Sequence, residues 1–182
     1  SLKRLMAYSA ILNMGYALVP LMIFDDRSLS ISLTYVFIYA ISTIGLFTAI
    51  SVSLGSASDT GTISDLAGIA RTKKATALII SICMFSMIGI PPFAGFFGKY
   101  YILVHALRCG EYLLAISMIL TSVIAAYYYL NIVKSMYFCD STIKASRDKL
   151  SGESLLLLVL TASFILLFSI FAKYSPLIIN FS

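Results

Sequence analysis

The sequence of 182 residues is poor in charge, in histidine and in paired cysteines. Charged residues make up 12% of the chain, against about 25% in a typical soluble domain, which disfavours a soluble globular class. The single histidine, His105, excludes a histidine-rich metal cluster, and the three cysteines lack the paired spacing of a zinc motif or a disulfide framework. Four prolines and ten glycines are too few for a low-complexity chain, and no GxxxxGK[ST] pattern for a phosphate-binding loop is present.

What the chain has instead is apolar residues, which make up 60% of it and gather in five long blocks. The blocks cover residues 5–24, 29–54, 75–107, 112–138 and 155–179, and charge is almost wholly confined between them. About 20 apolar residues are needed to cross the roughly 30 Å of hydrocarbon in a bilayer. The sequence therefore predicts an all-α integral membrane protein, with about five transmembrane helices in a single membrane domain.

The third block is too long for one straight crossing and too short for two. As one continuous helix it would reach about 50 Å, and near its middle stand Gly89, Pro91, Pro92, Gly95 and Gly98. A pair of prolines removes backbone donors and interrupts the helical hydrogen bonds. We expect a single crossing made by a broken helix, with the break near Pro91 and Pro92.

The distribution of lysine and arginine supports one crossing by each block. With five crossings, nine basic residues fall on one side of the membrane and three on the other, whereas a second crossing by the third block would nearly cancel this bias. The positive-inside rule then places the nine-charge side in the cytoplasm or its mitochondrial equivalent, and the C-terminus on the opposite side. The nine are Lys3, Arg4, Arg71, Lys73, Lys74, Lys134, Lys144, Arg147 and Lys149, and the three are Arg27, Arg108 and Lys173.

One basic residue, Lys99, stands inside the third block, eight residues before its end. An ammonium group at the centre of a bilayer costs roughly 3 kcal/mol even on the scale derived from insertion experiments. Two interpretations stay open. The side chain could extend along the helix to the interface, or it could face a polar cavity beside the break and exchange protons, because burial disfavours the charged form of a lysine.

The eight acidic residues all lie in loops or at the ends of blocks. A carboxylate partner for Lys99 within the membrane is therefore expected from another chain or from an upstream part of the protein. The sequence thus indicates that this chain does not translocate ions alone.

Each of the first two blocks carries polar residues along one helical face. These faces hold Ser9, Asn13 and Tyr16 in the first block, and Tyr35, Tyr39 and Ser42 in the second. Such faces are typical of hydrogen bonding between helices, and a hydrated proton path is the alternative. Near the end of the fourth block, the run from Tyr127 to Tyr129 is interpreted as an aromatic anchor at the interface.

Three stretches, in order, resemble one known family. They are KRLMAYSAILNMGY, SDLAGIARTKKATAL followed by MFSMIGIPPFAGFFGKYYIL, and SVIAAYYYLNIVKSMYF. They resemble the antiporter-like membrane subunits of NADH-quinone oxidoreductase (respiratory complex I), in the version typical of its subunit N, which is subunit 2 of the mitochondrial enzyme. The likeness covers roughly residues 2 to 140. The GFFGK element is also similar to the D-type component of multisubunit sodium/proton antiporters.

The resemblance implies a fold of fourteen transmembrane helices, of which this chain would hold about the last five and lack the N-terminal ones. It implies that Lys99 is the proton-channel lysine of the broken helix. The family often has a histidine at the place of Asn13, so a titrating role there is doubtful. Lys3 matches a recurrent family lysine, with anchoring at the interface as the alternative. The polar faces and the resemblance together suggest a polar path for protons. It consists of Lys3, Ser9, Asn13 and Tyr39.

The function implied is redox-driven proton translocation, with the chain acting as an enzyme only as part of the NADH:quinone oxidoreductase. Flavin, iron–sulfur clusters and quinone would belong to partner subunits, and this chain would hold no cofactor or metal and bind no nucleic acid. Its expected partners are the missing helices, antiporter-like neighbours and lipid, in a bacterial cell membrane or a mitochondrial inner membrane. The alternatives are a D-type component of a multisubunit sodium/proton antiporter and a structural or assembly fragment.

Overall fold

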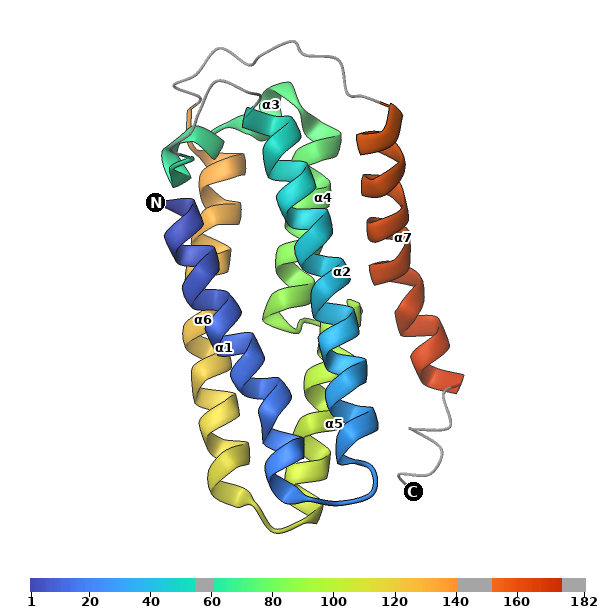
Figure 1. Ribbon diagram of the computed structural model, residues 1–182. Coiled ribbons are helices and arrows are strands. Elements are labelled where there is room, and N and C mark those ends of the chain that lie inside the picture. Colours follow the sequence, from blue (N-terminus) through green and yellow to red (C-terminus); the bar gives the residue numbers. More distant parts are fainter. Residues whose placement is uncertain (55–60, 141–151, 175–182) are drawn as a thin grey trace.

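A computed structural model of the protein describes residues 1–54, 61–140 and 152–174, which form a bundle of helices without strands (Figure 1). The predicted all-α fold is confirmed. Its elements are α1 (Leu2–Ile23), α2 (Ser28–Leu54), the 3₁₀ turn η2 (Ile63–Leu66), α3 (Ile69–Thr72), α4 (Lys74–Ile88), α5 (Ala94–Arg108), α6 (Tyr112–Phe138) and α7 (Gly152–Tyr174).

The third apolar block is broken where the proline pair predicts. Helix α4 ends at Ile88 and α5 begins at Ala94, and the residue after α4, Gly89, has a φ of 89°. Only glycine adopts this left-handed conformation without a steric penalty, which is why it commonly ends helices. Helix α5 continues in the direction of α4 (Figure 1), so the two short helices together make one traverse of the bundle.

Two glycines let the second half of the broken helix approach its neighbours closely. A Cβ atom at Gly95 would lie 1.7 Å from the carbonyl oxygen of Ser86, and one at Gly98 would lie 2.8 Å from the ring of Tyr35. The amide of Gly95 donates to Ser86 Oγ at 3.1 Å. The break is therefore held by contacts that a side chain at either position would obstruct.

Buried apolar side chains form two clusters, one on each side of the break. The cluster nearer the N-terminus of α1 brings together α1, α2, α4, α6 and α7, with Leu46, Ile80 and Met136 fully buried. The other cluster joins α1, α2, α5 and α6 around Ile31 and Ile102. Because α1, α2 and α6 run through both clusters, they hold α4 and α5 in a single bundle.

Three of the described helices, α1, α2 and α6, are long and apolar enough to cross a membrane. Helix α4 and the stretch Gly152–Phe168 of α7 are shorter apolar helices. Helix positions alone do not locate the bilayer, so the bounds of the five spans stay predictions. Residues 175–179 of the fifth predicted span lie outside the described residues, as do Lys144, Arg147 and Lys149 of the basic set.

Candidate functional site

Lys99 lies in the second turn of α5, directly beside the break. Its Nζ donates to the carbonyl oxygen of Ile88 at 3.1 Å, and Ile88 is the last residue of α4. The ammonium group also lies 4.9 Å from the centre of the Tyr16 ring on α1, a cation–π distance. The positive charge is thus placed at the negative end of the α4 dipole and over an aromatic face. Within the described part of the chain, no carboxylate forms an ion pair with Lys99.

Two cavities meet at Lys99. The larger, of about 310 Å³, lies between α5 and α6 and is mostly apolar, with Phe96, Leu103 and Val123 in its wall beside the hydroxyl of Ser122. The smaller, of about 10 Å³, is close to the minimum needed for one water molecule. Several residues with polar side chains border it, although most of its wall surface is apolar; the lining comes from α1, α2, α4 and α5, through Asn13, Tyr35, Ile38, Tyr39, Ser42, Ser86, Met87, Gly95 and Lys99. Lys99 therefore borders a larger apolar cavity and a much smaller one that several polar residues of α1, α2 and α4 also line.

A chain of buried hydrogen bonds leads to the smaller cavity from α6. Tyr129 OH is hydrogen-bonded to Ser9 Oγ on α1, and Asn13 Nδ2 donates to the same Oγ at 3.2 Å. Tyr35 OH on α2 then donates to Asn13 Oδ1 at 2.8 Å. These four side chains are buried, and so the polar faces predicted on the first two blocks meet one another in the interior.

Tyr16 connects Lys99 with the wall of the larger cavity. Its ring lies edge-on to the ring of Tyr35, with centroids 6.4 Å apart. Its hydroxyl donates to Thr121 Oγ1 at 3.0 Å and accepts from Ser122 Oγ at 3.2 Å. The aromatic ring that faces the ammonium is therefore fixed from both α2 and α6.

The structure brings most of the predicted site residues together. Asn13, Tyr39 and Gly95 line the smaller cavity with Lys99, and Ser9 is one hydrogen bond further along α1. Tyr39 is half-buried there, and Ser42 of the same helix lines the same cavity.

Other predicted residues lie further from this cavity. Lys3 is exposed in the first turn of α1 and borders a separate cavity of about 210 Å³ beside Leu54 at the end of α2. Pro91 and Pro92 are exposed at the break, where they separate α4 from α5. Gly98 faces α2 rather than a cavity.

Sequence reasoning missed Tyr129, which it assigned to an aromatic anchor at the interface. Tyr127 is exposed and Tyr128 is half-buried, but Tyr129 is completely buried. Successive residues of a helix point about 100° apart, so three adjacent tyrosines cannot share one environment. The spacing of Tyr129 from Ile132 and Met136, both buried apolar residues of α6, was the signal that could have identified it.

Replacing Tyr35 by phenylalanine is expected to lower the stability of the full-length protein by about 0.5–2 kcal/mol, because the buried oxygen of Asn13 loses its donor. The measurement is the thermal midpoint in mild detergent. Tyr127→Phe, on the exposed face of α6, is the matched control and should leave the midpoint unchanged. Equal midpoints for the two variants would contradict a contribution from the buried hydrogen bond.

The sequence model of one family, described as "NADH:quinone oxidoreductase/Mrp antiporter, TM", matches residues 1–125. The chain belongs to this family. The matched range includes α1, α2, α4, α5 and the first half of α6, and hence both the break and Lys99. As a member of the NADH:quinone oxidoreductase/Mrp antiporter family, the chain is a multi-pass membrane protein.

Individual relatives confirm the resemblance to subunit N. NADH-quinone oxidoreductase subunit N of Rickettsia prowazekii (strain Madrid E) is 46% identical over 176 residues, which is 92% of this chain and 38% of the relative. The same subunit of Rickettsia conorii (strain ATCC VR-613 / Malish 7) is 44% identical over 174 residues, 96% of this chain and 38% of the relative. The chain thus spans less than half the length of these relatives.

A solved structure shares the fold. A chain of respiratory complex I from Thermus thermophilus, determined with bound aureothin, superposes with a TM-score of 0.77 and 26% identity. The superposition covers 94% of this chain and 39% of that chain. The fold of this family member is therefore that of part of an antiporter-like membrane subunit.

Proposed function

We propose that the chain forms part of a proton-translocating membrane subunit of NADH:quinone oxidoreductase, and that Lys99 carries the proton. The observation that supports this most directly is the position of the Lys99 ammonium at the break, between an apolar cavity and a small cavity that several polar residues line. Burying a charged side chain in a membrane-spanning segment costs free energy, so a lysine at this position indicates a functional role. Half-helix ends beside a break are the arrangement by which transporters bind ions.

The contacts of Lys99 suggest how the proton is held and released. The carbonyl of Ile88 and the ring of Tyr16 both stabilise the ammonium form. Transfer of one proton to a water molecule in the smaller cavity leaves a neutral amine, whose lone pair can take the next proton from the other side. Proton uptake and release from opposite sides of one lysine would give directed transport.

The polar side of the site provides the path in this proposal. Ser9, Asn13 and Tyr39 line or adjoin the smaller cavity, and their hydroxyl and amide groups can both donate and accept hydrogen bonds. Lys3 would act as the surface group at the start of α1. Pro91, Pro92, Gly95 and Gly98 would maintain the break; none of these four exchanges a proton.

The energy for transport would come from elsewhere in the complex. The proposed partners are the other subunits of complex I, including the helices that this chain lacks relative to the longer subunit N proteins, together with antiporter-like neighbours and lipid. Flavin, iron–sulfur clusters and quinone would be bound by partner subunits. The complex would lie in a bacterial cell membrane or a mitochondrial inner membrane, with the nine-charge side inward and the C-terminus outward.

The test is to isolate the full-length protein from membranes in mild detergent and to identify its partners by native mass spectrometry. We expect it within a large complex that oxidises NADH and, in proteoliposomes, drives an uncoupler-sensitive proton gradient. Recovery as a small free species would overturn the proposal and favour a structural or assembly fragment.

A sodium/proton antiporter is the second candidate, because the family description names Mrp antiporters as well. It predicts copurification with antiporter subunits in place of NADH-oxidising ones. It also predicts a proton gradient that responds to added sodium and is indifferent to NADH. The same purification and the same proteoliposomes distinguish the two functions.

A further inference from the structure

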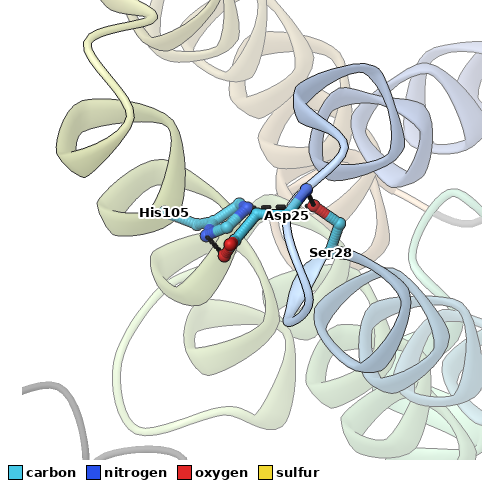
Figure 2. Close-up of polar contacts among 3 residues, drawn as sticks. All are labelled: Asp25, Ser28 and His105. Carbon is cyan, nitrogen blue, oxygen red and sulfur yellow. Dashed lines mark hydrogen bonds and ion pairs between the residues drawn. The ribbon is translucent and has the colours of Figure 1, made fainter.

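The only histidine of the chain is buried at the end of α5 that lies away from the break (Figure 2). His105 Nε2 is 3.1 Å from Ser28 Oγ, and His105 Nδ1 is 3.9 Å from a carboxylate oxygen of Asp25. Ser28 Oγ also accepts a hydrogen bond of 3.1 Å from the backbone N–H of Asp25. The last turn of α5, the loop after α1 and the first turn of α2 thus each contribute one polar residue.

The two ring nitrogens of His105 face different environments. The side chain of His105 is 4% exposed, whereas that of Asp25 is 47% exposed. Ser28, on the Nε2 side, is buried. The imidazole therefore has a buried hydroxyl on one side and a carboxylate open to solvent on the other, and histidine is a side chain that can act as a proton shuttle near neutral pH.

Charges near this cluster are of both signs. Asp25 and Arg27, both in the loop after α1, are the charged residues that act on the ring electrostatically. Asp26 of the same loop, Arg108 on α5 and Glu111 before α6 are exposed, as is Tyr112. His105, like Tyr101 one turn earlier on α5, is a buried titratable group, and it is the one next to these exposed charges at the end of α5.

A line of hydroxyl groups leads from the Lys99 site to His105. Ser28, Ser32 and Tyr35 are buried on one face of α2, at steps of four and three residues, and Tyr35 lines the smaller cavity with Lys99. Side chains at these steps are about 5–6 Å apart at Cβ, and the Ser32 hydroxyl between them donates to the carbonyl oxygen of Ala17 at 2.6 Å. On α5 itself, His105 follows Lys99 by about 9 Å of helix.

We propose that His105, Ser28 and Asp25 form the site through which the proton leaving Lys99 is released to the outer side of the membrane; this rests on the proposed function. The imidazole takes up a proton at Nε2 from the hydroxyl side, and one N–H bond forms there. It then gives up the proton on Nδ1 to the carboxylate of Asp25 through a water molecule, because the separation of 3.9 Å is too long for a direct hydrogen bond, and one N–H bond breaks. The ring is then the Nε2–H tautomer, and its rotation about Cβ–Cγ brings the unprotonated Nδ1 toward the hydroxyl side, where it can take up the next proton.

The test uses the full-length protein in its assembled complex, reconstituted in proteoliposomes, with NADH oxidation and proton translocation measured together. His105→Gln keeps a side chain that can hydrogen-bond with Ser28 but does not titrate. We expect it to lower the rate of proton translocation by roughly a hundredfold or more, since a positioned acid–base group contributes about 10²–10⁴-fold to a proton-transfer step. Glu111→Gln removes a charge from the same end of the bundle and should translocate protons normally.

Chemical rescue separates proton transfer from a purely structural role. In His105→Ala, imidazole added on the outer side is expected to restore translocation severalfold. Normal translocation in His105→Gln, or a loss in His105→Ala that imidazole does not restore, would overturn the inference. If neither histidine variant assembles, Asp25→Asn is the test. This variant keeps the hydrogen bond from the backbone N–H of residue 25 to Ser28 Oγ. Normal proton translocation in Asp25→Asn would also overturn the inference.

Lys99→Met in the same assay distinguishes a failure of the proposed release site from a failure of the proposed proton translocation through Lys99. If Lys99→Met loses translocation while His105→Gln is normal, the release site is wrong and the role of Lys99 stands. If Lys99→Met translocates protons normally, the proposed function itself fails, whatever the histidine variants do.

Discussion

Gly95→Ala is expected to prevent the full-length protein from accumulating in the membrane. The added Cβ would lie 1.7 Å from the carbonyl oxygen of Ser86 and 2.6 Å from its carbonyl carbon, so backbone must move away from backbone. The amide of Gly95 would then lose its bond to Ser86 Oγ. Overpacking of a buried site costs about 1–3 kcal/mol, and more where the backbone has to shift, which is a large part of the stability of a typical domain.

Gly15→Ala is the matched control, because Gly15 also lies within a helix but has no atom within 4 Å of an added Cβ. Alanine favours the helix by about 1 kcal/mol over glycine, so this variant should accumulate at least as well as the parent. The amount of protein in the membrane and its thermal midpoint in mild detergent measure both effects. If the two variants accumulate equally, α5 does not approach Ser86 as closely as described.

The break could be predicted because its cause is local. Two adjacent prolines with glycines on either side, inside a block too long for one helix, interrupt the hydrogen bonds wherever the rest of the chain lies. The long helices α1, α2, α6 and α7 follow in the same way from the length of four of the apolar blocks. The close approach of α5 to Ser86 could not be foreseen. A glycine in the sequence is compatible with close packing of another backbone, but it does not indicate which residue packs there.

The site was predicted in part for a comparable reason. Lys99 is conspicuous as a lone charge in an apolar block, and Asn13 and Tyr39 belong to polar faces that the helical period makes visible. Tyr129 was misassigned because the three tyrosines were interpreted together, although the spacing of Tyr129 from the buried Ile132 and Met136 distinguishes it from its two neighbours. The contacts of His105 join residues about eighty positions apart in the sequence, and no local pattern indicates such a pair.

Lys99→Met is expected to abolish most proton translocation by the assembled complex. Methionine fills nearly the same space in the larger cavity but carries no proton, and it makes neither the bond to Ile88 nor the cation–π contact with Tyr16. The rate should fall by roughly tenfold or more, as for the loss of a positioned proton-transfer group. Initial rates of NADH-driven acidification in proteoliposomes measure this, with native gels to show that the complex has assembled. Lys74→Met removes an exposed lysine from the first turn of α4 and should translocate protons normally.

Lys99→Arg decides whether Lys99 acts by its charge or by exchanging its proton. Arginine retains a positive group that can donate to the carbonyl of Ile88 and lie over the Tyr16 ring, and the adjoining cavity of about 310 Å³ has room for the longer side chain. Arginine does not release its proton in proteins. If the charge at the end of α4 only stabilises the break, Lys99→Arg should translocate protons nearly as well as the parent. If Lys99 is the proton carrier, Lys99→Arg should assemble normally and be as inactive as Lys99→Met.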